Sequence, residues 1–516
     1  MDKITLAYTT DVHGFITSDS FFNNRGSSHG IAHVASVLNE IREEGQEVLY
    51  FDNGDSISGS LLSIRCAEDY RLAVPLISAL NAMDCKFSVL GNHEFDFGRK
   101  YLDKVIDQSE FPWLAANIFK NGSKKPAFGQ SWLIHETEFG KKIAFIGVTT
   151  EETATLAYKE LIRDLRIISP LEVLAQQIEE VKCEGADVIV VCYHGGYESG
   201  LCYWQSDEDI GPLTSEIAEN FPEIDLLITG HTHGCTANRE INGVHTIQAG
   251  CNGMFLGRID LTFDKNGKIS FNSEVISAKK TEMDETVLEV TQKAHESTDA
   301  WLTEVVASSK DSYIPESPNS PLIKPSRLMS LIHDVLRDHS NCDITVAHFW
   351  DMTGWGKGPV KRKKILNLIP DNYLHILNMT GQNMRLALER SAAFFQVSDD
   401  NRCIVSTKIY DYDIWSGIHY KVDISKPGGE RIVELSHNGE EVQDKDRFKV
   451  ALYHFRAGGA LGYDMLRHHR PIWRSPLTVR EHLFKYLKNN ERLKVPVENN
   501  FLIVNDDEIV NDAFLE

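Results

Sequence analysis

Five separate stretches of the sequence are apolar for several residues and then stop beside a glycine and an Asp, His or Asn side chain. The stretches, with the segments that follow them, are Ile4–Tyr8 before Asp11–Gly14, Val48–Phe51 before Gly54 and Asp55, Phe87–Leu90 before Gly91–Glu94, Val188–Val191 before His194–Gly196, and Leu226–Ile228 before Gly230–Gly234. Short, nearly continuous apolar runs are typical of strands buried on both faces. Because function in such sheets lies beyond the carboxyl ends of the strands, the pattern predicts that strands far apart in sequence deliver polar side chains to one pocket.

The length of the chain predicts two domains, because 516 residues exceed what one hydrophobic core usually supports. Residues 1 to about 280 alternate strand-like runs with helical patterns, such as Ile31 to Arg42 and Leu171 to Lys182. This alternation indicates an α/β layer structure. We expect it to close with a β-hairpin from Arg258 to Phe271 that turns at Asn266 and Gly267.

A change in composition marks the second domain. A charge-rich helical stretch from Asp284 to about Val306 predicts a linker helix, and several prolines then precede a new helical pattern from Ser326 to Asp338. We therefore expect a catalytic domain over residues 1–283, a helical linker over 284–310, and a mixed α+β domain over 311–516.

Charge and composition limit the partners and the location. The formal net charge of −22 disfavours polymeric nucleic acid, which binds clustered Lys and Arg. No apolar run is long enough to span a bilayer, and the sequence passes from Met1 directly into the first strand-like run without a signal peptide. These features predict a cytoplasmic protein that does not bind membranes. The nine cysteines include no Cys-x-x-Cys pair, so we expect them to be reduced.

The side chains at the five strand ends form a set suited to a pair of metal ions. Asp11 and His13 lie two residues apart, so in extended chain both would point the same way and could hold one ion, and His231 and His233 share this spacing. Asp55 is the best candidate for a ligand that bridges two ions. Neutral Asn92 offers a carbonyl oxygen, and the seventh ligand is His194. Sites with such oxygen and nitrogen donors accept Mn, Zn, Fe, Co or Mg.

Each of these residues has a simpler interpretation when it is taken alone. A single Asp after a strand, such as Asp11, is usually a helix cap, and Asp52 and Asp225 are expected to be capping or turn residues. Isolated histidines such as His135 are more often structural or surface residues, so they are left unassigned. Recurrence at five strand ends beside glycines, which permit close backbone approach, favours the metal site.

The sequence blocks resemble the calcineurin-like metallophosphoesterases, and their order resembles the 5′-nucleotidase branch of that superfamily. The most specific block is Gly91–Gly98. The resemblance implies a four-layer α/β/β/α first domain and two divalent ions. One ion would be bound by Asp11, His13, Asp55 and His233, and the other by Asp55, Asn92, His194 and His231. It also implies that His93, oriented by Asp96, acts at the phosphate as a transition-state stabiliser or proton donor.

The second domain resembles the nucleotide-binding domain of the same family. The segments that carry the likeness are Leu368–Leu374, Ser416–Pro427 and Phe455–Gly459, and the last two look most like the 2′,3′-cyclic-nucleotide 2′-phosphodiesterase and 3′-nucleotidase branch. The resemblance implies that Tyr412 and Tyr463 sandwich the base and that Gly458 and Gly459 contact substrate. The glycine pair is equally compatible with a simple turn.

One segment departs from the family pattern. Many members have an Asn-Gly-Gly-Ile-Arg type segment near the start of this domain, whereas this chain has Val346–Asp351. The expected reaction is removal of phosphate from a small nucleotide by attack of metal-bound water, as a 5′-nucleotidase or as a cyclic phosphodiesterase and 3′-nucleotidase. The alternatives are a metallophosphoesterase acting on a non-nucleotide ester and a catalytically silent nucleotide-binding protein.

Overall fold

The computed structural model describes residues 2–18, 29–197, 212–265, 267–279, 281–370, 372–397, 403–405, 411–489, 495–506 and 508–510. The chain divides into two compact units, Met1–Asp299 and Ala300–Glu516. The division falls inside helix α8 (Glu285–Thr303), earlier than the expected boundary near residue 310. The rest of the expected linker includes strand β15 (Val305–Ser309), which pairs with β17 (Gly358–Lys361) of the second unit.

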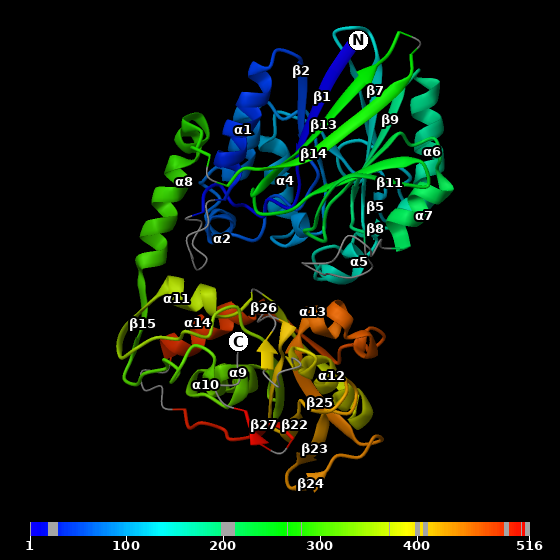
Figure 1. Ribbon diagram of the computed structural model, residues 1–516. Coiled ribbons are helices and arrows are strands. Elements are labelled where there is room, and N and C mark those ends of the chain that lie inside the picture. The colour runs from blue at the N-terminus through cyan, green and yellow to red at the C-terminus, as the bar shows by residue number, and fades with distance from the viewer. Residues whose placement is uncertain are drawn as a thin grey trace. The chain divides into compact units, whose positions relative to one another are not determined.

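Two six-stranded sheets form the centre of the first unit (Figure 1). The first sheet has the order β14-β13-β1-β2-β3-β4, with β1 to β4 parallel and β13 antiparallel to β1. Its strands are β1 (Asp2–Thr9), β2 (Glu47–Asp52), β3 (Ser88–Val89), β4 (Trp113–Leu114), β13 (Phe255–Phe263) and β14 (Ile269–Ser277).

The second sheet has the order β11-β12-β10-β9-β7-β6, with β7, β9, β10 and β12 parallel. Its strands are β6 (Trp132–Glu136), β7 (Lys142–Thr149), β9 (Val188–His194), β10 (Leu226–Thr229), β11 (Cys235–Ile241) and β12 (Val244–Ala249), and β5 (Ile118–Lys120) pairs separately with β8 (Leu165–Ile167). All five apolar stretches therefore contain strands, as their patterns predict.

The two sheets face each other across a shared core. Ile4 and Leu6 of β1 belong to the same buried cluster as Val188 and Val190 of β9, and all four side chains are fully buried. On its other face, the second sheet packs against α6, and α1 contacts β2 and β13 of the first sheet. Figure 1 shows α1 and α6 on opposite sides of this pair of sheets. The first unit is thus the expected α/β/β/α arrangement.

The helices of the first unit include both helical patterns expected from the sequence. The first pattern is α1 (Ile31–Glu43). The second is α6 (Pro170–Cys183), which begins with Pro at the position where its missing N–H costs nothing. The others before α8 are α2 (Leu61–Glu68), α3 (Pro75–Ala82), the 3-10 turn η1 (His93–Phe95), α4 (Arg99–Gln108), α5 (Thr153–Leu156) and α7 (Pro212–Asn220). The hairpin is present, since Phe263 pairs with Ile269, but the expected turn residue Asn266 lies outside the described residues.

The second unit mixes strands and helices. One five-stranded sheet has the order β21-β16-β25-β18-β26, another has the order β24-β23-β22-β27-β28, and β19 pairs with β20. The strands are β16 (Ile344–Ala347), β18 (Tyr373–Thr380), β19 (Phe395–Val397), β20 (Cys403–Val405), β21 (Ile414–Ser416), β22 (His419–Asp423), β23 (Ile432–His437), β24 (Glu440–Glu441), β25 (Arg447–Tyr453), β26 (Trp473–Thr478), β27 (Phe501–Asn505) and β28 (Glu508–Ile509).

The helices of the second unit pack on these sheets around one large buried cluster. They are α9 (Ser320–Ile323), α10 (Arg327–Ser340), α11 (Arg362–Leu368), α12 (Gly381–Ala392), α13 (His454–Ala457), α14 (Val479–Asn489) and the 3-10 turns η3 (Ala460–Gly462) and η4 (Asp464–Leu466). The expected helix after the proline-rich stretch is α10. Its cap is Ser326, whose hydroxyl accepts the N–H of Met329 at 3.2 Å.

Two further expectations concern membranes and cysteines. Among the described residues, no helix combines the length and apolar character needed to cross a bilayer. The eight cysteines that the structure describes are all free, and six of them are buried while Cys183 and Cys235 are exposed.

Candidate metal centre

The strand ends of both sheets supply the expected ligands. Asp11 and His13 follow β1, Asp55 follows β2 and Asn92 follows β3. From the second sheet, His194 is the last residue of β9, and His231 and His233 follow β10. Asp11, Asp55, Asn92, His194 and His231 are each at most 3% exposed. The structure therefore brings the seven predicted ligands into one buried region of the first unit.

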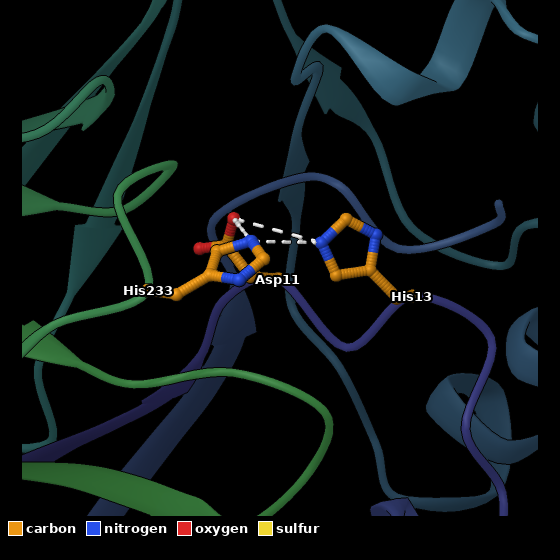
Figure 2. A group of neighbouring side chains, drawn as sticks. All are labelled: Asp11, His13 and His233. Carbon is orange, nitrogen blue, oxygen red and sulfur yellow. Dashed lines mark hydrogen bonds and ion pairs between the residues drawn. The ribbon is translucent and has the colours of Figure 1, made fainter. Parts of the chain in front are cut away.

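Three of them form one cluster, drawn in Figure 2. His13 Nε2 lies 3.0 Å from His233 Nε2, and Asp11 Oδ1 lies 3.2 Å from His233 Nε2. Asp11 Oδ1 is also 4.0 Å from His13 Nε2. Imidazole nitrogens and a carboxylate oxygen that face one another at these separations fit a single ion, which binds such donors at about 2.0–2.2 Å.

Asp55, His194 and His231 form a second cluster, whose ligand atoms all lie within 4.8 Å of one another. His194 Nε2 is 3.1 Å from Asp55 Oδ2 and 4.0 Å from Asp11 Oδ1, so the two clusters adjoin. Asn92 presents a buried carbonyl oxygen that has no hydrogen-bond partner within the described part of the chain. The next residue, His93, donates its N–H to Asp55 Oδ1 at 2.7 Å, so a buried oxygen without a partner at this place is consistent with a ligand whose partner is a cation.

The backbone at these ligands corrects one expectation. Asp11 and His13 were expected in extended chain, but their φ angles are +53° and +52°, in the left-handed region. Asp55, His231 and His233 are left-handed as well, with φ of +55°, +69° and +61°. Residues other than glycine rarely adopt this conformation, and such strain clusters at functional sites. After β1, β2 and β10 the ligands therefore lie on left-handed backbone, and not on extended chain whose side chains alternate.

Hydrogen bonds from the loop after β2 orient two of the imidazole rings. His13 Nδ1 lies 2.8 Å from the carbonyl oxygen of Ser58, and His194 Nδ1 lies 2.6 Å from that of Asn53. A carbonyl can only accept, so Nδ1 carries the hydrogen in each ring. Nε2 of each ring is then left to face the cluster, which is the usual arrangement of a metal-ligating histidine.

Electrostatics favour the deprotonated forms of Asp11 and His13. Burial raises the pKa of Asp11, but the neighbouring His233 and His194 outweigh burial and lower it to about 2. Burial, and then His233, lower the pKa of His13 to about 4, so this imidazole is neutral near pH 7. A carboxylate and a neutral imidazole are the forms that bind divalent ions.

Glu94 holds two loops of the site together, a role that its sequence pattern does not predict. This side chain is fully buried, and its carboxylate accepts the backbone N–H groups of Asp55 at 2.9 Å, Ser56 at 2.6 Å, Ile57 at 3.3 Å and Gly91 at 2.7 Å. It thereby joins the loop that carries Asp55 to the loop that carries Asn92. The one signal in the sequence is its place beside His93 in the Gly91–Gly98 block.

Asp52 was expected to be a turn or capping residue. It makes a turn bond, and it also bonds to side chains of neighbouring strands. Its carboxylate accepts the N–H of Gly54 at 3.1 Å, which is a local turn bond. It also accepts the hydroxyls of Thr9 and Ser88, both at 3.0 Å, and that of Ser56. Asp52 therefore links the ends of three neighbouring strands at the base of the site.

His93 and Asp96 are close together beside the clusters. His93 Nδ1 lies 2.7 Å from Asp96 Oδ2, which also accepts the Ser58 hydroxyl at 2.7 Å. The His93 ring meets the edge of the His13 ring, with centroids 5.2 Å apart, yet 35% of the His93 side chain is exposed. Burial lowers the pKa of His93, but Asp96 and Asp55 outweigh burial and raise it to about 10. The structure thus places an imidazole whose protonated form is favoured by Asp96 and Asp55 at the exposed side of the two ligand clusters.

In the second unit, Tyr412 and Tyr463 are 3% and 1% exposed. The Tyr412 ring stacks on Phe394, with centroids 5.0 Å apart, and it meets the edge of Phe395. The guanidinium carbon of Arg456 lies 4.7 Å from the centre of the Tyr463 ring. Stacking on a base requires an open ring face, and Phe394 already covers one face of Tyr412. The base-binding role of both rings stays a prediction.

The glycine pair ends a short helix. Gly458 and Gly459 follow α13, and the N–H of Gly458 donates to the carbonyl of His454 at 2.9 Å. Gly459 has φ +89°, and a Cβ there would lie 2.8 Å from Cβ of Arg467. The structure accounts for this glycine by its turn, and contact with substrate stays a prediction.

The segment that departs from the family pattern contributes to a buried polar group in the second unit. Arg456 Nε donates to both carboxylate oxygens of Asp413, at 3.1 and 3.0 Å, and His348 Nδ1 lies 3.3 Å from Asp413 Oδ1. Arg456 is 1% exposed and Asp413 2%. A buried basic side chain, Arg456, is therefore present beside His348. It comes from α13, and not from the segment Val346–Asp351 that departs from the family pattern.

Comparison with known protein families gives two matches along the chain. Residues 4–235 match the calcineurin-like phosphoesterases, and residues 305–468 match the 5′-nucleotidase C-terminal domain. The first match covers all seven candidate ligands and His93 with Asp96. The second covers Tyr412, Tyr463 and the glycine pair.

Individual relatives extend over most of the chain. A trifunctional nucleotide phosphoesterase, YfkN, of Bacillus subtilis is 24% identical over 97% of this chain, which spans 39% of that protein. A 2′,3′-cyclic-nucleotide 2′-phosphodiesterase/3′-nucleotidase of Haemophilus influenzae is 26% identical over 88% of this chain and 80% of its own length. Among solved structures, a candidate 5′-nucleotidase from Staphylococcus aureus in complex with alpha-ketoglutarate superposes over 98% of this chain and all of its own. The TM-score is 0.84 and the identity 25%.

Proposed function

We propose that this chain, which joins a calcineurin-like phosphoesterase domain to a 5′-nucleotidase C-terminal domain, is a hydrolase that removes phosphate from nucleotides with the help of two divalent ions. The observation that carries the proposal is the convergence of six ligands from four strand ends into two adjoining clusters, together with the buried, unpartnered side-chain oxygen of Asn92 at a fifth strand end. The named activities of the relatives support nucleotides as the substrate class. These relatives include 5′-nucleotidases and cyclic-nucleotide phosphodiesterases. The substrates of the assay below therefore differ in the position of the phosphate on the sugar.

In this proposal, the candidate ligands of the first unit bind the two ions, and neighbouring groups hold those ligands in position. One ion would be held by Asp11, His13 and His233. The other ion would be held by Asn92, His194 and His231. Asp55 would bind both ions. Ions bound there would supply positive charge for the phosphoryl oxygens and lower the pKa of a water molecule. Glu94 and the backbone carbonyls of Ser58 and Asn53 keep the ligands in place before any substrate arrives.

His93 is the residue proposed to act on the substrate itself. Its Nδ1 is engaged by Asp96, so Nε2 is the nitrogen left to donate to a phosphoryl oxygen or to the departing sugar oxygen. Positioned proton donors of this kind contribute about 10²- to 10⁴-fold to rate. The partial exposure of His93 beside the buried clusters agrees with this role.

The test is phosphate release by ion-loaded protein from 5′-AMP, 3′-AMP, 2′,3′-cyclic AMP and p-nitrophenyl phosphate. We expect one nucleotide to be preferred strongly over the aryl phosphate. His93→Ala should lower kcat about 10²- to 10⁴-fold with its ion content unchanged, whereas Asn92→Ala should bind one ion more weakly. His135→Ala, which changes a half-buried histidine bonded to Glu47, is the matched control and should keep full activity.

Three outcomes would count against the proposal. Activity on the aryl phosphate alone would favour a non-nucleotide ester. Ion binding without any hydrolysis would favour a nucleotide-binding protein without catalysis. Full activity in His93→Ala would remove the assigned role of that imidazole.

A further inference from the structure

One ligand histidine differs from the others in how its ring is held. His13 and His194 each bond one ring nitrogen to a backbone carbonyl and turn the other toward the cluster. Within the part of the chain that the structure describes, neither ring nitrogen of His231 has a hydrogen-bond partner, although the residue is only 2% exposed. A carboxylate oxygen of Glu152 lies 3.7 Å from His231 Nε2.

The loop that carries Glu152 is fixed to the site by backbone bonds. It follows β7, where the side chain of Asn117 accepts the N–H of Thr149 at 3.0 Å and donates to its carbonyl at 2.7 Å. The N–H of Thr150 then donates to the carbonyl of His194 at 2.9 Å. Glu152 comes two residues later, immediately before α5, with 36% of its side chain exposed. Its position is therefore set by the strand that ends in His194.

The position of Glu152 separates two possible roles. Asp55, His194 and His231 offer ligand atoms that are mutually within 4.8 Å, and Glu152 is not part of that group. Its carboxylate therefore lies beside His231 Nε2 without belonging to the set of atoms that are mutually close enough to share an ion. A metal-ligating imidazole commonly donates its second N–H to a carboxylate, which fixes the tautomer and the ring orientation.

We propose that Glu152 is the positioning residue of His231, accepting the hydrogen of Nε2 so that Nδ1 is presented to the ion. The proposed bond requires a rotation of the Glu152 side chain that shortens the 3.7 Å separation to hydrogen-bond length, about 2.8 Å. The inference rests on the proposed dinuclear function. It adds a residue of the loop after β7 to a site whose ligands come from other strands, and it predicts that one ion depends on Glu152 while the other does not.

The test is calorimetric titration of the ion-free full chain with Mn²⁺. The unaltered protein should bind two ions. Glu152→Ala should weaken one of them about 10- to 100-fold, which is the usual effect of removing such a partner, and leave the other unchanged. Glu152→Gln keeps an acceptor oxygen and should lose less. Glu151→Ala, which removes an exposed neighbouring carboxylate, is the matched control and should bind like the unaltered protein.

Other outcomes separate the two proposals. If the unaltered protein binds no divalent ion, the proposed function fails, whatever Glu152 does. If it binds two and Glu152→Ala binds both equally well, only the role of Glu152 is refuted. If Glu151→Ala weakened ion binding as much as Glu152→Ala, the effect would come from general negative charge. That result would also refute the role of Glu152. X-ray absorption that shows one oxygen donor lost from the ion in Glu152→Ala would make Glu152 a ligand, and so overturn the positioning role.

Discussion

Replacing Asp413 by Asn should remove several kcal/mol from the stability of the second unit. Asp413 is the common partner of Arg456 and His348, and both ions of the Asp413–Arg456 pair are almost fully buried. Asn keeps the shape of the side chain but not its charge. The guanidinium of Arg456 would then remain buried without its counter-charge.

The magnitude follows from two considerations. Burial raises the pKa of Asp413, but Arg456 and then His348 outweigh burial and lower it from 3.8 to about 2. At about 1.4 kcal/mol per pKa unit, the charged form is favoured in the folded state by roughly 2–3 kcal/mol. Breaking a buried pair by removing one partner costs about 3–5 kcal/mol, because the other charge is left uncompensated. We therefore expect a loss of about 3–5 kcal/mol near pH 7.

The pH dependence has a defined sign. The pKa of Asp413 is lower in the folded than in the unfolded chain, so its stabilisation is complete above about pH 4. It is lost as the pH falls through about 2. A measurement near neutral pH therefore reports the whole effect.

The assay is urea unfolding of the full chain, followed by hydrogen exchange resolved for each unit, because two units need not unfold together. The matched control is Asp84→Asn in the first unit. Asp84 pairs with Lys86 at 2.7 Å, but the two side chains are 67% and 40% exposed. An exposed pair contributes about 0–1 kcal/mol. Asp413→Asn would refute the reasoning if it cost less than about 1 kcal/mol, or no more than the control.

Three further predictions follow from single contacts. Glu94→Gln turns an amide NH₂ toward two of the four backbone N–H groups. A buried N–H left without an acceptor costs about 1–3 kcal/mol, so losing two bonds should destabilise the first unit by ~2–6 kcal/mol in urea unfolding. Gly91→Ala places a Cβ 2.3 Å from Asp55 Oδ1, so ion content measured by atomic absorption should fall while the fold, checked by circular dichroism, persists. Burial, and then Arg337, lower the pKa of His333 to about 3, so the second unit should lose stability as the pH falls from 6.5 toward 3. His333→Gln should remove ~2–3 kcal/mol of the loss between pH 6.5 and 4.5, and an unchanged slope would contradict this assignment.

Much of the fold and the ligand set could be predicted from the sequence because the relevant signals are local. A strand buried on both faces needs a continuous apolar run, and the residue at which the run stops marks the strand end. The runs that end near Asp11, Asp55 and His194 show this directly, and α1 and α10 follow from their helical patterns. The expected cytoplasmic location depends on no such local signal and stays a prediction.

The tertiary structure alone decided how the ligands are held. Left-handed φ angles at Asp11 and His13 arise because their loop bonds to the loop after β2, with the N–H of Asp11 donating to Gly54 and that of His13 to Asp55. Glu94 looks like an ordinary acidic residue until the fold surrounds it with four backbone N–H groups.

Burial likewise distinguishes the roles of two residues of the same type. Asp52 and Asp84 both lie near strands, but Asp52 is fully buried and accepts hydrogen bonds from two neighbouring strands, whereas Asp84 is exposed. The physical reason is that solvation and pairing depend on what the rest of the chain places around a side chain. The sequence by itself determined which residues could bind ions. The tertiary structure decided which of them face one another and which neighbours hold them.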